Sequence, residues 1–367
     1  MKQTEYFGPG SIKNLNLILQ EENSKNIFLV CGKESFETSG AKHYIDQFSQ
    51  EYFFTRFSDF SSNPKIEQIQ AGLELFNQRG YDTILAVGGG SPIDVAKAIK
   101  LFALEKSPKR KLPLIAIPTT SGSGSEATHF IVYYKGGVKQ SAGNKEITLP
   151  EYAIIDPLLT LSLPSYQTAC TGLDALSQAI ESYWCINSTD ESKSYAREAI
   201  SLVLGNLEEA VKHPENITAR SAMAKSANLA GKAINISKTT ACHAIAYPIT
   251  SKFNIPHGHA CALTLAEMLD YNSRISDVRE CNDSRGLEYV EKTMKELVEI
   301  VGAKDVAEAK KIINTLMNRV GAKTKLSELG IDDIEYILDN GFAPERVKNN
   351  PRFLTKENLN KILLFIQ

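Results

Sequence analysis

The segment 83–97 joins a strand-like run, a glycine turn and a helix, and it constrains the fold more than any other part of the sequence. Residues 83–87 read Thr-Ile-Leu-Ala-Val, a pattern typical of a parallel strand covered on both faces. Three glycines follow at once, and Pro92 suits the first turn of a helix because its missing N–H would have no partner there. This order predicts a βαβ unit of a parallel sheet.

The same pattern recurs in the first part of the chain and then stops. Further strand-like runs lie at 26–31, 52–57 and 112–117, with amphipathic stretches between them. After residues 153–157 the periodicity becomes helical, as in 195–209, 219–234 and 287–301, with almost no strand signal. For 367 residues we therefore predict two domains: a dinucleotide-binding α/β domain over 1–162 and an all-helical domain over 163–367.

The charge balance limits the possible partners. Lysine plus arginine number 41 against 43 aspartate plus glutamate, so the chain has no excess charge with which to bind nucleic acid or an anionic membrane. Neither a secretory signal nor an apolar run of membrane-spanning length is apparent. We expect a cytoplasmic protein, a homodimer, with a small-molecule substrate.

The triple glycine at the end of the third strand is a candidate phosphate-binding turn, although it is also compatible with a simple tight turn. A second loop rich in glycine and hydroxyl groups, 118–128, follows the next strand, and two such loops at adjacent strand ends suit a dinucleotide. The candidate contacts in this region are Gly88, Gly89, Gly90, Ser91, Asp94, Thr119, Thr120, Ser123 and, farther along the chain, Lys145.

A metal site is suggested by a carboxylate and two imidazoles. Asp174 and Gln178 are four residues apart on a helix predicted to begin near Thr171, so they share a face. His243 lies in another predicted helix, and His257 lies in a Pro-His-Gly turn. Such donors suit Zn²⁺, Fe²⁺ or Mn²⁺, but singly these residues are also compatible with a helix cap, a core histidine and a turn residue.

The six cysteines include no CxxC pair, and most lie in apolar segments. We expect neither disulfides nor a thiolate metal site. Cys242 and Cys261 lie near the candidate ligands in sequence but are interpreted as small core residues.

Just before His243, Lys238 and the hydroxyl residues around it, including Thr239, stand at a predicted helix start. Helix starts of this kind bind anions. An ordinary cap with a solvated lysine is the alternative.

Four motifs together resemble the iron-containing, or group III, alcohol dehydrogenases over essentially the whole chain. GGGSPIDVAKAI, IPTTSGSGSEAT, GLDALSQAIESY and HAIAYPIT followed by PHG occur in the family's order and at its spacing. The resemblance implies the dehydroquinate synthase-like fold, an α/β dinucleotide domain followed by a helical metal domain, with the active site in the cleft. It maps the metal ligands, iron or zinc, onto Asp174, Gln178, His243 and His257.

Two positions depart from the family's ligand pattern. Gln178 replaces the usual histidine, and because a glutamine carbonyl is a poorer ligand than imidazole, the metal would be held more weakly or by three side chains plus water. Tyr247 stands where histidine is frequent; its phenol would hydrogen-bond the ribose, assist proton transfer or simply pack.

A third departure concerns the cofactor. Family members that prefer NAD commonly carry an aspartate just after the first strand, where this chain has Gly32, Lys33 and Ser35. Without that carboxylate a 2′-phosphate is not repelled, and Lys33 and Ser35 offer it contacts. We predict that NADPH is accepted and suspect that it is preferred to NADH.

The stretches DALSQAIESYW, ISKTTACHAIAYPIT and IPHGHA look like the phosphonoacetaldehyde reductase branch of this family. That branch reduces phosphonoacetaldehyde to 2-hydroxyethylphosphonate, which implies substrate contacts from Lys238, Thr239 and His259. The expected chemistry is hydride transfer from NAD(P)H to a carbonyl polarised by the metal, with Asp174, His243, His257 and Tyr247 as the catalytic set.

Three other functions are compatible with parts of the sequence. One is a general group III alcohol dehydrogenase for uncharged short-chain substrates. Another is a dehydroquinate synthase-like lyase, which is disfavoured because Asp174 stands where those enzymes have glutamate. The last is a non-catalytic binding protein, suggested by the lost histidine at Gln178.

Overall fold

The computed structural model describes residues 3–106, 111–136 and 138–367, and every candidate site residue named above lies within these ranges. The chain divides into two compact units. The first unit consists of Met1–Leu163 and Pro214–Ala224, and the second of Pro164–His213 and Lys225–Gln367. The sequence-based division placed 214–224 in the second domain; it groups with the first unit, where Ala224 packs against Ala153 and Ile155.

The first unit is built on a parallel sheet of six strands in the order β1-β8-β5-β4-β2-β3. The strands are β1 Thr4–Phe7, β2 Asn26–Cys31, β3 Phe53–Phe57, β4 Thr83–Gly88, β5 Leu114–Pro118 and β8 Tyr152–Ile155. The predicted α/β fold with a parallel sheet is confirmed, and the four predicted strands correspond to β2, β3, β4 and β5. A separate antiparallel hairpin, β6 Ile131–Lys135 and β7 Val138–Ala142, was not predicted.

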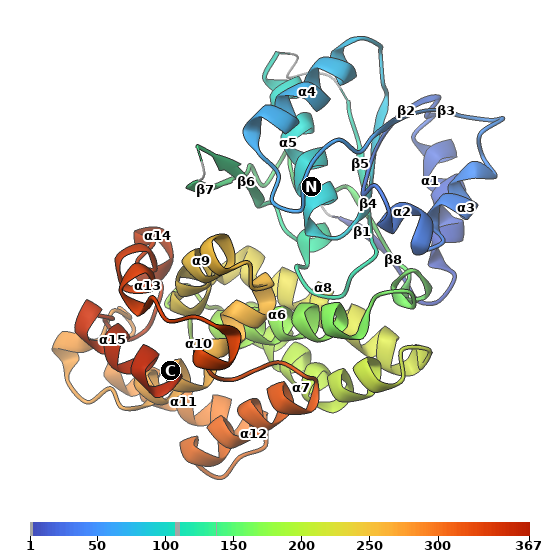
Figure 1. The fold of residues 1–367 in the computed structure, drawn as a ribbon. Coiled ribbons are helices and arrows are strands. Elements are labelled where there is room, and N and C mark those ends of the chain that lie inside the picture. Colours follow the sequence, from blue (N-terminus) through green and yellow to red (C-terminus); the bar gives the residue numbers. More distant parts are fainter. Residues whose placement is uncertain (1–2, 107–110, 137) are drawn as a thin grey trace. The chain divides into compact units, whose positions relative to one another are not determined.

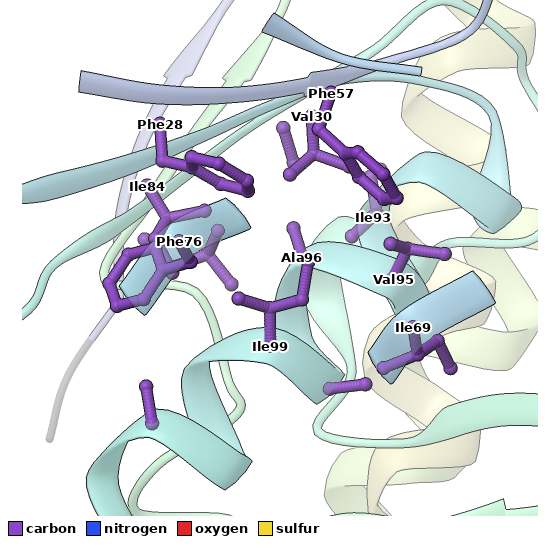
Figure 2. Packing of buried hydrophobic residues seen from close by; sticks show 14 of the residues in the cluster. Phe28, Val30, Phe57, Ile69, Phe76, Ile84, Ile93, Val95, Ala96 and Ile99 are labelled. Carbon is purple, nitrogen blue, oxygen red and sulfur yellow. The ribbon is translucent and has the colours of Figure 1, made fainter. Parts of the chain in front are cut away.

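Helices cover both faces of this sheet, as Figure 1 shows. They are α1 Asn14–Glu21, α2 Ser35–Thr38, α3 Ala41–Asp46, α4 Ile66–Asn77 and α5 Gly90–Lys106. Because successive side chains of a strand point to opposite faces, Phe28 of β2 packs toward α4 and α5 while Ile27 and Leu29 pack toward α1 to α3. Figure 2 shows Phe28, Phe76 and Ile99 in the first of these cores.

The second unit is helical, and its described residues contain no β-strand beyond an isolated bridge between Cys281 and Arg352. The helices of this part of the chain are α6 Ser165–Trp184, α7 Asp190–Lys212, α8 Ile217–Ser237, α9 Ala241–Phe253, α10 His257–Ser273, α11 Leu287–Val301, α12 Val306–Arg319, α13 Ile334–Asn340, α14 Pro344–Val347 and α15 Lys356–Phe365; α8 begins within the segment assigned to the first unit. Figure 1 labels each of these helices.

Two expected helix boundaries were wrong. Helix α6 begins at Ser165 rather than near Thr171, because Pro164 caps its start and accepts the first hydrogen bond, from Thr168, at 2.8 Å. His257 is the first residue of α10, capped by Pro256, and not part of a preceding turn. Both prolines stand just outside a helix, where their fixed φ causes no loss of a helical bond. Across the described residues, no helix is both long and apolar enough to cross a membrane.

Candidate functional site

The glycine turn between β4 and α5 has a backbone that only glycine tolerates. Gly88 has φ of 145°, and a Cβ added there would lie 2.6 Å from Cγ of Pro92. The chain can therefore reverse tightly and begin α5 at Gly90, with the first N–H groups of a 17-residue helix directed beyond the end of the strand. Such N–H groups, supported by the helix dipole, favour a phosphate.

The second loop lies directly beside this turn. Strands β4 and β5 are neighbours, with Gly88 opposite Pro118. A Cβ on Gly89 would lie 3.3 Å from the Thr120 side chain, and one on Gly90 would lie 3.0 Å from Oγ of Ser123. The structure thus brings the two hydroxyl groups onto the glycine backbone, as expected for two phosphate-binding loops at adjacent strand ends.

Other predicted cofactor contacts hold the loops together. The carboxylate of Asp94 accepts hydrogen bonds from Oγ of Ser125 at 2.6 Å and from the N–H of Val132 at 3.0 Å. Ser91 donates to the carbonyl of Ser62, and Thr119 donates its N–H to the carbonyl of Gly88. These bonds hold the conformation of the two loops from within.

Lys97, which sequence reasoning missed, connects α5 to the loop that follows β5. Its buried ammonium donates to the carbonyl of Ser125 at 2.6 Å and to that of Phe130 at 3.0 Å. Burial lowers the pKa of Lys97 to about 8, against the opposing attraction of Asp94. Lys145, by contrast, is exposed in the turn that follows β7.

The end of β2 carries two cations. Arg56 on β3 donates from Nη2 to the carbonyls of Gly32 at 3.2 Å and Lys33 at 2.8 Å, and it was not predicted. Lys33 is exposed and lies 3.1 Å from a carboxylate oxygen of Asp59. A Cβ on Gly32 would lie 2.2 Å from Oγ of Ser35, so a larger residue here would displace the Ser35 hydroxyl.

Helices α6, α9 and α10 bring together four potential metal ligands. One donor atom from each of Asp174, His243, His257 and Cys261 lies within 4.8 Å of every other. Asp174, His243 and Cys261 are buried. Cys261, interpreted from the sequence as a small core residue, is one turn after His257 on α10 and faces the same point.

Gly258 allows α10 to approach α6 this closely. A Cβ at position 258 would lie 2.0 Å from the carbonyl oxygen of Cys170 and 2.7 Å from Cβ of Asp174. The backbone of α10 therefore rests on that of α6, which sets the adjacent His257 beside Asp174.

A buried glutamate orients one of the histidines. Glu181 of α6 accepts a hydrogen bond from Nδ1 of His243, and Nε2 of that ring lies 3.5 Å from Oδ1 of Asp174. Burial alone would raise the pKa of Glu181, but the charge and hydrogen bonds of His243 hold it below its usual value. Glu181 follows Asp174 by seven residues, and this helical spacing was the signal that could have revealed it.

Glu181 also caps α9, which revises the predicted anion site. Its Oε1 accepts from the hydroxyl of Thr240 at 2.8 Å and from the N–H of Cys242 at 2.8 Å. A carboxylate of the protein itself thus holds the donors at this helix start that were expected to serve an external anion. Lys238 precedes them, exposed and in a left-handed conformation with φ of 72°.

Thr239 is buried, and its hydroxyl accepts a hydrogen bond from Nη1 of Arg346 at 2.9 Å. Arg346, on α14, is a cation at Thr239 that sequence reasoning missed. His259 has both ring nitrogens engaged, Nδ1 with the hydroxyl of Tyr166 at 2.9 Å and Nε2 with the carbonyl of Lys323 at 2.7 Å. These two bonds leave neither nitrogen of His259 for a substrate.

The two departures from the family pattern lie next to the ligands. The amide nitrogen of Gln178 donates to Oδ2 of Asp174 at 3.2 Å. The ring of Tyr247 is stacked on that of His257, with ring centroids 6.1 Å apart and an angle of 22° between the planes.

Comparison with known proteins covers nearly the whole chain. The model described as iron-containing alcohol dehydrogenase matches residues 3–157, and that of the Fe-containing alcohol dehydrogenase family, C-terminal, matches residues 168–365. The chain is 30% identical over 302 residues to phosphonoacetaldehyde reductase of Streptomyces viridochromogenes, spanning 77% of this chain and 75% of that protein. It is 28% identical over 383 residues to the NAD-dependent methanol dehydrogenase of Bacillus methanolicus, spanning 97% and 96%.

A solved structure is similar over the same extent. The crystal structure of sulfoacetaldehyde reductase from Bifidobacterium kashiwanohense in complex with NAD⁺ superimposes with a TM-score of 0.87 and 31% identity. The match covers 99% of this chain and 96% of that one.

Proposed function

This chain belongs to the iron-containing alcohol dehydrogenase family of oxidoreductases, and from that premise we propose that it reduces phosphonoacetaldehyde to 2-hydroxyethylphosphonate. The reaction consumes the aldehyde, one NADPH and one proton and yields the primary alcohol and NADP⁺. The observation that carries the proposal is the convergence of Asp174, His243 and His257 on one point. The proposal also includes the homodimeric state and the cytoplasmic location that we expect from the sequence.

The donor set fits a divalent ion of the zinc or iron type. It offers one carboxylate oxygen, two imidazole nitrogens and one sulfur within 4.8 Å, all on three helices of one compact unit. When bound, the ion supplies Lewis acidity that polarises a carbonyl group, and the reduced nicotinamide supplies the hydride.

The protein's own groups prepare this centre. Asp174 contributes an anionic oxygen, and Gln178 holds the other oxygen of that carboxylate by a hydrogen bond. Glu181 fixes His243 with Nδ1 as the donor, so that Nε2 would be available to an ion at the point it shares with Asp174. The phenol of Tyr247, whose ring lies nearly parallel to that of His257, is the group we assign to carry a proton to the product oxygen.

The cofactor site supports NADPH. The glycine backbone at Gly89 and Gly90, with Thr120 and Ser123 beside it, suits the pyrophosphate. At the end of β2 no carboxylate stands at position 32 to repel a 2′-phosphate, and Lys33 and Arg56 carry positive charge there.

Two cations support an anionic substrate. Lys238 is exposed, and Arg346 reaches the hydroxyl of the adjacent Thr239. Thr240, next along the chain, is bonded to the same Glu181 that holds His243, so this cationic segment is linked to the metal ligands. Two of the similar proteins are named for two-carbon aldehydes that carry a phosphonate or a sulfonate.

Reduction of uncharged short-chain aldehydes is the second candidate. It is favoured by the likeness to methanol dehydrogenase and by Glu181, which occupies the helix start where an anion was expected.

A comparison of kcat/KM for phosphonoacetaldehyde, sulfoacetaldehyde and propionaldehyde, measured by oxidation of NADPH, separates the candidates. We expect the phosphonate to be preferred, and Lys238→Ala and Arg346→Ala to lower its kcat/KM about 10- to 100-fold each, since hydrogen bonds to charged groups contribute about 1.5–3 kcal/mol. Propionaldehyde turnover serves as the control and should change little. Equal turnover of charged and uncharged aldehydes in all three proteins contradicts the phosphonate assignment.

A further inference from the structure

Cys261 stands where the metal centre needs another donor. Gln178 occupies the position of the family's usual histidine, and its amide nitrogen faces Asp174 as a hydrogen-bond donor at 3.2 Å. That orientation uses Gln178 to hold the Asp174 carboxylate. Among the histidine, cysteine, aspartate and glutamate side chains of the described residues, Sγ of Cys261 joins Asp174 and the two histidines within 4.8 Å.

We propose that Cys261 binds the metal as a thiolate, which makes the ligand set Asp174, His243, His257 and Cys261. The inference rests on the metal site of the proposed function and deepens it. On binding, the S–H bond of Cys261 breaks, a sulfur–metal bond forms and the proton passes to solvent.

The distances between donor atoms agree with one ion among them. With zinc bonds of about 2.0–2.2 Å to nitrogen or oxygen and about 2.3 Å to sulfur, tetrahedral angles place nitrogen about 3.4 Å from oxygen and about 3.6 Å from sulfur. Nε2 of His243 lies 3.5 Å from Oδ1 of Asp174. Nε2 of His257 lies 3.8 Å from Sγ of Cys261.

The local structure favours this arrangement over simple packing of a thiol. His257 and Cys261 are one helical turn apart on α10, the usual spacing for two ligands on one helix face. The side chain of Cys261 is fully buried, and Asp174 and His243 converge on it from two other helices. Cys242, the residue before His243, is buried as well but is not part of the four-donor cluster.

A thiolate changes which ion the site selects. Sulfur is a soft ligand and favours zinc, cadmium or cobalt over manganese or magnesium. Asp174, His243, His257 and Cys261 would together hold such an ion, which would supply Lewis acidity to a substrate carbonyl.

The test is spectroscopic and does not depend on turnover. The full-length protein, stripped of metal and kept reduced, is titrated with Co²⁺, and the near-ultraviolet thiolate-to-cobalt charge-transfer absorption is recorded together with the visible ligand-field bands. We expect the wild type and Cys242→Ser to show both. Cys261→Ser should keep the ligand-field bands, lose the charge-transfer band and bind Cd²⁺ at least about 10-fold more weakly relative to Mn²⁺, because it exchanges a soft ligand for a hard one.

A measurement on the wild-type protein keeps the proposal testable if the Cys261→Ser variant does not fold. X-ray absorption of the zinc-loaded wild type should show a sulfur neighbour at about 2.3 Å. Cobalt or zinc bound with only nitrogen and oxygen neighbours overturns the thiolate ligand and leaves the proposed reductase function standing. A protein that binds no divalent metal overturns both.

Discussion

Glu181 accepts a hydrogen bond from Nδ1 of His243, and the two residues are 62 positions apart in the chain. The same carboxylate accepts from the backbone and hydroxyl of Thr240 and from the N–H of Cys242. One buried glutamate thus caps helix α9 and fixes the tautomer of a candidate metal ligand. Partners of this kind behind a ligand fix its orientation and raise its basicity.

Glu181→Gln is expected to weaken metal binding about 10- to 100-fold, the usual effect of removing such a partner. All the groups around Glu181 are donors, so an amide NH₂ in place of one oxygen would face another donor. The dissociation constant for Co²⁺ or Zn²⁺, measured by competition with a chelator, checks this. Glu296→Gln, which alters another hydrogen-bonded glutamate of the same unit, is the matched control.

Gly258→Ala is expected to destabilise the protein and to impair metal binding. The new methyl group would overlap the carbonyl of Cys170 and push α10 from α6, at a cost of about 1–3 kcal/mol or more. Gly205→Ala is the control, because Gly205 is exposed within helix α7 and a Cβ there meets nothing within 4 Å. That change should stabilise by up to about 1 kcal/mol. Equal unfolding free energies of the two variants would contradict the close approach of α10 and α6.

The buried ammonium of Lys97 predicts a pH dependence of stability. Burial lowers its pKa from 10.5 to about 8, so between these values the unfolded chain binds more protons than the folded one. The unfolding free energy therefore gains a positive slope with pH in this window, at most about 1.4 kcal/mol per pH unit. Below pH 8 both states are protonated and the contribution to the slope vanishes.

Denaturant unfolding of the wild type, Lys97→Met and the exposed control Lys304→Met between pH 7.5 and roughly 10.5 measures that slope. Buried thiols such as Cys31, whose pKa burial raises to about 11, contribute the opposite slope in all three proteins and cancel in the comparison. Lys97→Met alone should lose the positive contribution. An unchanged slope in that variant would show that Lys97 is not the group responsible.

Cofactor selectivity should follow the charges at the end of β2. Lys33→Ala is expected to lower kcat/KM for NADPH about 10- to 100-fold with little effect on NADH, the range expected for a lost hydrogen bond to a charged group. Asp59→Asn should act in the opposite direction, because Asp59 lies 3.1 Å from the Lys33 ammonium and competes with a 2′-phosphate. If neither variant changes the ratio of kcat/KM for NADPH to kcat/KM for NADH, Lys33 does not contact that phosphate.

Much of the first unit could be predicted because its central strands are buried on both faces. The runs that form β2, β4 and β5 contain few polar residues, whereas β1 is an edge strand with mostly exposed side chains, so its pattern is weak. Helix α6 could be recognised from its periodicity and from Pro164 before it, but the expected start near Thr171 was too late, since the residues between Pro164 and Thr171 include several polar side chains.

The sequence allowed single residues of the site to be predicted, but not the contacts between them. Asp174, His243 and His257 were recognised by type and family spacing, and the structure brings them together. Cys261 stands one helical turn after His257, but the apolar segment around it led to its interpretation as a core residue. The spacing of Glu181 from Asp174 places it on the ligand face of α6, but its bonds to α9 could not be predicted, because a hydrogen bond between distant helices leaves no local pattern.

The central claim, reduction of an anionic aldehyde, is tested most directly by following phosphonoacetaldehyde itself. Metal-loaded protein, NADPH and phosphonoacetaldehyde are mixed, and the phosphorus NMR spectrum is recorded alongside the loss of NADPH absorbance. We predict conversion to 2-hydroxyethylphosphonate, with one NADPH oxidised for each aldehyde consumed. An unchanged phosphonate signal in a sample that still reduces propionaldehyde would contradict the account.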